Sequence, residues 1–128
     1  MGTDGHAFLE KWHRIVRERD RAAVREILAE DVLMGAPPHW RNLEGREWVG
    51  KLLGVIMDTI EDFTYHREWV QDGELALEFT GRVGKHDLQG IDLISLNDEG
   101  KIQRLDVMIR PLNTLAELAN VVGQRMMG

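Results

Sequence analysis

The chain has 128 residues, no cysteine and a formal net charge of −6; 43% of its residues are hydrophobic and 30% are charged. This composition predicts one folded domain over residues 1–128, and it excludes a disulfide scaffold, a thiolate nucleophile and a cysteine-ligated zinc site. The acidic charge does not favour nucleic acid or anionic lipid, and no apolar run approaches the roughly 20 residues that span a bilayer, so we expect a cytoplasmic protein with neither partner.

Two amphipathic helices are predicted at the start of the chain. Apolar residues recur at helical spacing over residues 6–19, and Thr3 or Asp4 can cap this helix. Asp20 then begins a second helix with an apolar face of its own. Because each helix is apolar on one side only, the pair must pack against another element.

A short strand, a loop and a third helix are predicted next. Residues 31–34 have the pattern of a strand, which the following Gly-Ala-Pro-Pro run ends. We expect an irregular loop over residues 39–44 and a helix over residues 45–59, whose two glycines lower its helix propensity. The inner face of that helix would carry Trp48, Val49, Leu52, Leu53 and Ile56.

The second half of the chain changes to the two-residue period of strands. The pattern predicts strands over residues 63–70, 75–80, 87–96 and 102–109, separated by glycine-containing turns. Pro111 ends the last strand, and the run from Thr114 to Glu117 has the spacing of a capping box that opens a terminal helix.

This order of elements predicts an α+β fold. The N-terminal helices would pack on the concave face of one curved, mainly antiparallel sheet, and a C-terminal helix would follow. Such a layer leaves a conical, apolar space between helices and sheet, and concave apolar spaces are where small molecules bind.

Three segments resemble nuclear transport factor 2-like proteins, in particular ketosteroid isomerases and SnoaL-like proteins. They are the Ala-Glu-Asp run ending at Asp31 with the Gly-Ala-Pro run ending at Pro37, the stretch 90–102, and Arg110-Pro111-Leu112. With the element order, the resemblance covers nearly the whole chain. It implies a cystatin-like cone with a central pocket, and it specifies the fold better than the function, because this fold hosts many activities.

The resemblance can be followed to the catalytic positions of ketosteroid isomerases. Their strand acid, kept protonated so that it can donate a hydrogen bond to an enolate, is matched by Asp92. Trp12 stands where they have an oxyanion-hole tyrosine, and Ala36 stands where they have the catalytic base. One of three groups is kept, so a steroid isomerase with that mechanism is not expected.

Limonene epoxide hydrolases resemble the same fold but are matched less well. Their strand arginine falls on Gly90 and their second acid on Val107; SnoaL-like cyclases also carry an acid on that last strand. If Asp92 faces the pocket, its inward neighbours on the last strand are Leu105, Val107 and Ile109. A register slip of one residue would instead bring Asp106 inside.

Asp92 is the candidate catalytic residue. It lies between Ile91 and Leu93 in an apolar strand, and burial would raise its pKa and make it an acid at neutral pH. A structural acid bonded to Trp12, Trp40 or a backbone N–H is an equally good interpretation.

The candidate substrate-binding residues are aromatic or lie on the last strand: Trp12, Trp40, Tyr65, His39, Leu105, Val107 and Ile109. Core packing is the favoured explanation of Trp12, with one edge of its ring reaching the pocket. Tyr65 would face inwards with Phe63 and Trp69 and could donate to a carbonyl, or its hydroxyl could reach solvent. Trp40 and His39 lie in a loop and would form the pocket mouth.

No metal and no cofactor is predicted, because the five histidines lack the paired spacing of metal ligands. Two functions stay open. In the first, the pocket binds a small apolar molecule and catalyses proton transfer, of isomerase, cyclase or hydrolase type, with Asp92 as the acid. In the second, the domain is a non-catalytic, dimeric ligand-binding or interaction module. A second titratable group opposite Asp92 would favour the enzyme.

A homodimer is expected under either function, through the outer face of the sheet. That face would carry Ala76, Leu93 and Met108, which are too apolar to face water.

Overall fold

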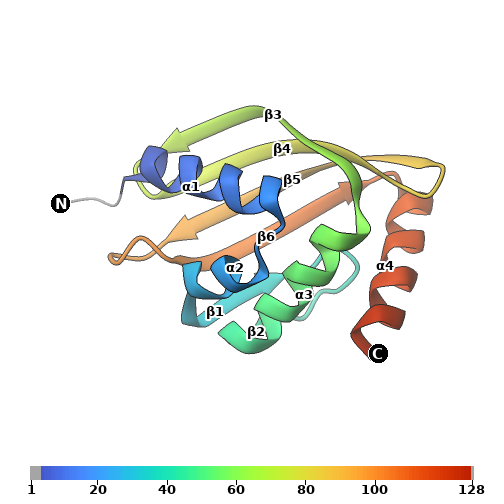
Figure 1. Cartoon of the computed structure of the whole chain (residues 1–128), viewed down its shortest axis with the longest axis horizontal. Coiled ribbons are helices and arrows are strands. Elements are labelled where there is room, and N and C mark those ends of the chain that lie inside the picture. Colours follow the sequence, from blue (N-terminus) through green and yellow to red (C-terminus); the bar gives the residue numbers. More distant parts are fainter. Residues whose placement is uncertain (1–3, 128) are drawn as a thin grey trace.

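The computed structural model describes residues 4–127 and shows a curved sheet with three helices on one face and a fourth at one end (Figure 1). The helices are α1 (Gly5–Glu18), α2 (Arg21–Ile27), α3 (Arg46–Thr59) and α4 (Leu112–Met127). The strands are β1 (Leu28–Gly35), β2 (Leu43–Glu44), β3 (Glu61–Gln71), β4 (Glu74–Val83), β5 (His86–Leu96) and β6 (Ile102–Arg110). Their order in the sheet is β2-β1-β6-β5-β4-β3, and β1 and β6 are the parallel pair in an otherwise antiparallel sheet. The predicted α+β architecture is confirmed.

The first two helices begin at the predicted caps. The Asp4 carboxylate accepts hydrogen bonds from the backbone N–H groups of His6 and Ala7, and that of Asp20 accepts one from Ala23. These bonds satisfy donors that have no partner inside the helix. Thr3, the alternative cap, lies outside the described residues.

The first strand differs from its prediction at both ends. β1 begins at Leu28, directly after α2, and it pairs with a two-residue strand, β2, inside the segment that was expected to be an irregular loop. Two residues are too short to show a period, so the sequence could not indicate β2.

A bulge in β3 changes which side chains share a face. The pairing of β3 with β4 shifts between Tyr65 and Glu68, so Trp69 lies opposite Ala76 on the outer face. The prediction that Trp69 faces inwards with Tyr65 is therefore wrong, because an inserted residue reverses the alternation beyond it.

The predicted capping box at the start of the last helix is also wrong. α4 begins at Leu112, and the Thr114 hydroxyl, which is buried, donates to the carbonyl of Asp87 at 2.9 Å. This bond joins α4 to the start of β5. α4 packs its face of Thr114, Leu118 and Val122 against α3 and the ends of the central strands.

The core fills the layer between the helices and the concave face of the sheet. Its largest fully buried side chains include Phe79, Ile15, Leu28, Met34 and Ile60. None of the helices within residues 4–127 is long and apolar enough to cross a membrane.

Candidate functional site

An inner cavity of about 70 Å³ lies between α1, α3 and the concave face of the sheet. Its lining is apolar except for Trp12, Tyr65 and Asp92, which carry its buried or half-buried polar groups, and the exposed Arg19. The apolar lining consists of Val16, Leu53, Ile56, Met57, Ile60, Phe63, Phe79, Leu105, Val107 and Ile109. A few polar groups in an apolar enclosure are the usual features of a small-molecule site.

A chain of two hydrogen bonds connects the polar groups of this cavity. Trp12 Nε1 donates to the Tyr65 hydroxyl, and that hydroxyl donates to Asp92 Oδ2, each at 2.8 Å. The three residues come from α1, β3 and β5. The rings of Phe63 and Phe79 pack around Tyr65, with centroid distances of 4.9 and 6.3 Å, and hold the phenol in place.

The donors and acceptors in this chain fix where protons lie. The indole of Trp12 can only donate, so the Tyr65 oxygen accepts from it and turns its own proton towards Asp92 Oδ2. Asp92 Oδ2 is therefore an acceptor in either protonation state. When Asp92 is neutral, its proton must lie on the other oxygen, Oδ1.

The second carboxyl oxygen of Asp92, Oδ1, is free to contact a ligand. Oδ1 has no hydrogen-bond partner among residues 4–127. In that part of the chain, every side-chain nitrogen or oxygen that is fully buried does have a partner. Oδ1 must then touch accessible space, and Asp92 lines the inner cavity. An acid that presents a single free oxygen to an apolar space is equipped to bind one polar atom of a ligand.

Burial raises the pKa of Asp92 to about 7, and the hydrogen bond from Tyr65 lowers it by a smaller amount. The residue is only 7% exposed. Burial, followed by the nearby Asp92 carboxyl, raises the pKa of Tyr65 well above its usual value, so the phenol stays protonated. At neutral pH the site therefore holds a phenol donor and an acid near its midpoint.

A second cavity, of about 230 Å³, lies between α3, α4 and the loop after β1. His39 lines it, with Trp48 on α3 and the Pro37-Pro38 pair. Ile56 lines both cavities. The remaining lining is apolar and consists of Ala36, Leu43, Leu52, Leu115, Leu118, Ala119, Val122, Gly123 and Met126.

The structure separates the residues that were expected at the pocket mouth. His39 lines the second cavity and not the one at Asp92, and Trp40 is 100% exposed and lines neither. Pro37 and Pro38 form a turn, and Trp40 follows it fully in solvent, so the expectation that it lies at the pocket mouth is corrected. Trp48, expected on the inner face of α3, is half-exposed at the second cavity.

The last strand has the expected register. Leu105, Val107 and Ile109 line the inner cavity, and Asp92 pairs with Val107. Asp106 lies on the outer face, where Arg104 donates to it at 2.8 Å, so the alternative register is excluded.

Three residues near the site were not anticipated. His13 Nε2 lies 2.6 Å from Glu68 Oε2, and its ring packs on Tyr65 at 5.6 Å between centroids. Neither His13 nor Glu68 lines the inner cavity, so this pair joins α1 to β3 beside the site. Arg19 does line the cavity. It ends α1 in the left-handed backbone conformation, and the sequence does not indicate this conformation.

Apart from Asp92, the positions that the sequence resemblance aligned with catalytic acids, bases or an arginine carry none of these groups. Ala36 is buried and lines the second cavity, and Val107 presents an aliphatic group opposite Asp92. At Gly90 a Cβ would lie 2.4 Å from the Phe79 ring and 2.6 Å from the Met108 carbonyl, so no side chain fits there. Among the residues that line the inner cavity, Asp92 is the one carboxylic acid.

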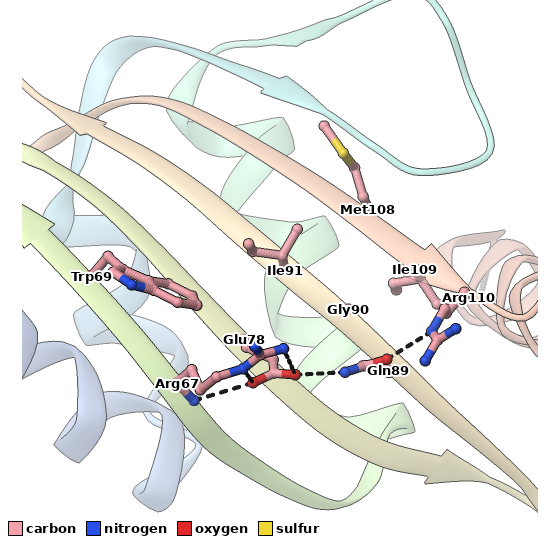
Figure 2. A pocket seen from close by; sticks show the side chains of 9 residues that line it. All are labelled: Arg67, Trp69, Glu78, Gln89, Gly90, Ile91, Met108, Ile109 and Arg110. Atoms are coloured by element: carbon pink, nitrogen blue, oxygen red, sulfur yellow. Dashed lines mark hydrogen bonds and ion pairs between the residues drawn. The ribbon is translucent and has the colours of Figure 1, made fainter.

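The outer face of the sheet carries an open groove crossed by a polar chain (Figure 2). Arg67 donates to both oxygens of Glu78, Gln89 donates to Glu78 Oε2, and Arg110 donates to Gln89 Oε1. Figure 2 shows apolar side chains on one side of this chain, namely Trp69, Ile91 and Met108. Trp69 and Met108 are more than half exposed, at 53% and 56%.

The fold and sequence are similar to those of solved structures. A steroid delta-isomerase from Pseudomonas aeruginosa is 34% identical, over 96% of this chain and 91% of that one, with a TM-score of 0.91. A protein with a cystatin-like fold from Silicibacter pomeroyi is 33% identical, over 95% and 86% of the two chains, also with a TM-score of 0.91. A nuclear transport factor 2-like protein from Mesorhizobium loti, 16% identical over 84% and 91% with a TM-score of 0.74, shares the fold.

No protein-family model and no curated protein sequence matches the chain. Its identity of 33–34% to two solved structures over nearly its whole length, together with the helices packed on a curved sheet, shows which family it belongs to. The chain belongs to the ketosteroid isomerase-like, nuclear transport factor 2-like superfamily of cystatin-like folds.

Proposed function

We propose that this protein binds a small apolar carbonyl compound in the inner cavity, with neutral Asp92 donating a hydrogen bond from Oδ1 to the carbonyl oxygen. The observation that carries the proposal is the direction of the hydrogen-bond chain. Trp12 donates to the Tyr65 hydroxyl, which in turn donates to Asp92 Oδ2, so the acid proton is on Oδ1, the second oxygen of a carboxyl group that lines the cavity.

This arrangement matches a carbonyl better than an alcohol, amine or acid. A carbonyl oxygen only accepts hydrogen bonds, and the free group of neutral Asp92 donates one. The apolar walls, with Phe63, Phe79 and the aliphatic residues, suit a hydrocarbon body. A charged ligand would lose its hydration in this space without an ion-pair partner at Asp92.

Proton-transfer catalysis is the second candidate, and the similarity to a steroid delta-isomerase favours it. A hydrogen bond from Asp92 would stabilise the negative charge that develops on a carbonyl oxygen during enolisation. The reaction also needs a base, and the inner cavity offers no carboxylate or imidazole other than Asp92. We therefore place binding first, and turnover of an enolisable ketone would need water as the base.

Binding can be followed through the Trp12 indole, which donates into the chain at the cavity. Small ketones such as cyclohexanone would be titrated into protein with nitrogen-labelled tryptophan, and the four indole N–H signals assigned by replacing each Trp by Phe. We expect the Trp12 signal to shift and the signal of fully exposed Trp40 to stay unchanged. Affinity should fall as pH rises through about 7, because the ionised acid loses its donor.

Two variants at Asp92 separate hydrogen bonding from shape. Asp92→Asn keeps a donor and should bind without pH dependence, since its oxygen can accept from Tyr65 while its amide faces the cavity. Asp92→Leu keeps the size, removes the donor and should weaken binding by about twofold to twelvefold, corresponding to a net hydrogen bond of about 0.5–1.5 kcal/mol. Equal affinity in wild type and Asp92→Leu, or tighter wild-type binding at high pH, would disprove the proposal. The same samples would be assayed for double-bond migration in an unsaturated ketone.

We also propose that two copies associate through the outer face of the sheet. A twofold axis brings a surface patch against itself. The outer groove suits this, because it combines half-exposed apolar side chains such as Trp69 and Met108 with both partners of an ion pair, Arg67 and Glu78. Stable interfaces bury about 800 Å² on each partner, which requires most of such a face.

The mass in solution tests this association. We expect light scattering at micromolar concentration to give the mass of two chains, and Met108→Glu to give the mass of one. Leu112→Glu, at an exposed residue of α4, is the matched control and should leave the dimer intact. A monomeric wild-type protein would rule out the dimer.

A further inference from the structure

The inner cavity alone is too small for most ligands. Its volume is about 70 Å³, whereas ligand pockets usually span roughly 300–1,000 Å³. A space of this size has room for a carbonyl group and a few neighbouring atoms. A ligand of ordinary size must extend beyond it, and the direction in which it can extend is visible in the structure.

The second cavity offers the missing volume. It measures about 230 Å³, and it meets the inner cavity at Ile56, which lines both. Ile56 is half-buried on α3, and its aliphatic side chain can change rotamer where the two cavities adjoin. Leu53, Met57 and Ile60 also line the inner cavity on the side of α3, but they do not line the second cavity. Ile56 is therefore the residue that the two linings share.

The lining of the second cavity specifies what it can hold. Apart from His39 it is hydrocarbon and aromatic, with prolines at one side and α4 at the other. Leu115, Ala119 and Gly123 follow one another at four-residue spacing on α4, so they form one row along the cavity. Because this row ends in small residues, it leaves space that a larger side chain would fill.

We propose that the two cavities form one site for an elongated ligand, a carbonyl compound with a flexible aliphatic tail, whose tail passes Ile56 and lies between α3 and α4. This inference rests on the proposed binding of a carbonyl at Asp92 and adds the class of its ligand. The tail makes no hydrogen bonds, and its contribution grows with length because each buried methylene leaves water.

Two tryptophans report separately on the two parts of the site. Trp12 lines the inner cavity and Trp48 the second cavity, while Trp40 and Trp69 line neither and serve as internal references. The probes are methyl ketones of increasing length, from acetone to undecanone, titrated into protein with nitrogen-labelled tryptophan. Short ketones should shift the Trp12 signal alone, and long ones should shift both Trp12 and Trp48. Affinity should rise about fourfold per buried methylene until the tail outgrows the cavity.

Gly123 gives a blocking variant that leaves the Asp92 site untouched. Gly123 lines the second cavity, and a Cβ at this position meets nothing within 4 Å, so Gly123→Leu adds bulk at the end of the α4 row without a clash. We expect this variant to bind acetone and butanone like the wild type but to lose the gain with length. Gly123→Ala is the matched control and should keep most of the gain. Ala119→Met fills the same space from the neighbouring turn, as a second blocking variant.

The outcomes separate this inference from the proposed function. Asp92→Leu should weaken the whole series by one factor without changing the gain per methylene. If short ketones bind but affinity does not grow with length, or grows equally in Gly123→Leu, the tail site is wrong and the carbonyl site stands. If length matters as expected but Asp92→Leu changes nothing, the carbonyl site is wrong and the tail site stands. If no ketone binds, both are wrong.

Discussion

Glu78 and Asp92 are acids on neighbouring strands of one sheet, and the two faces of that sheet give them opposite properties. Their exposures are similar, 9% and 7%. On the outer face, hydrogen bonds from Arg67 and Gln89 outweigh burial and lower the pKa of Glu78 to about 2. On the inner face, Asp92 is bonded by Tyr65 alone, and burial raises its pKa to about 7. Burial is the larger influence on the pKa of Asp92, whereas the hydrogen bond from the cationic Arg67 is the larger influence on that of Glu78.

Asp92→Asn should have the largest effect on this contrast. The folded protein binds a proton at Asp92 more tightly than the unfolded chain, so its stability falls as pH rises from about 3.8 to about 7 and stays low above that. Removing the charge should stabilise the protein above pH 7 by on the order of 2–4 kcal/mol, with little effect near pH 4. Urea unfolding at a series of pH values measures this. A variant that is less stable than wild type at pH 9 would show that Asp92 is not disfavoured as an anion.

Tyr65→Phe should come next. It leaves both the Trp12 N–H and Asp92 Oδ2 without their partner, and each unpaired buried group costs about 1–3 kcal/mol. The free energy of unfolding should fall by about 2 kcal/mol or more, and the pKa of Asp92 should rise above about 7, because the bond from Tyr65 lowers it. Carbon-detected NMR of the Asp92 carboxyl reads this pKa.

The matched control for Tyr65→Phe lies on the outer face. Gln89→Met removes one of the bonds to Glu78, where water can replace it, and should change stability much less. An equal loss of stability in the two variants would mean that the hydrogen bonds at Tyr65 stabilise the fold no more than the hydrogen bond from Gln89 does.

Glu78→Gln should have the smallest effect, and in the opposite pH range. The folded-state pKa of Glu78 lies below its ordinary value of 4.5, so its stabilising contribution is complete above that value and is lost as pH falls towards about 2. The variant should be less stable than wild type at neutral pH and equal to it near pH 2. Acid unfolding followed by circular dichroism tests this. If wild type and variant lose stability equally as pH falls below 4.5, the ion pair between Glu78 and Arg67 is contradicted.

The sequence was sufficient for the helices, for the strands other than β2 and for the orientation of Asp92, because apolar periodicity determines which face of a strand is buried. It was not sufficient for the partners of Asp92. Tyr65 is 27 residues away along the chain, and no local pattern links the two strands. The inward placement of Trp69 failed for a related reason, since a bulge is a feature of pairing and not of one strand alone.

Two further errors, at Thr114 and Trp40, have causes that only the fold shows. Thr114 has the spacing of a cap, but its hydroxyl bonds to Asp87 in a neighbouring strand, a competing partner that only the fold supplies. Trp40 was expected at a pocket because it is aromatic and in a loop, and it lies in water. Composition suggests that a loop has a function; it does not indicate where the loop points.

The contacts of Gly90 have a consequence for redesigning this protein. The Phe79 ring covers it from one side, and the Met108 carbonyl, which belongs to the backbone of β6, blocks it from another. Shrinking Phe79 would relieve one obstruction and leave the other. An arginine beside Asp92, as in limonene epoxide hydrolases, is therefore not one substitution away. That chemistry could be introduced only by shifting a strand.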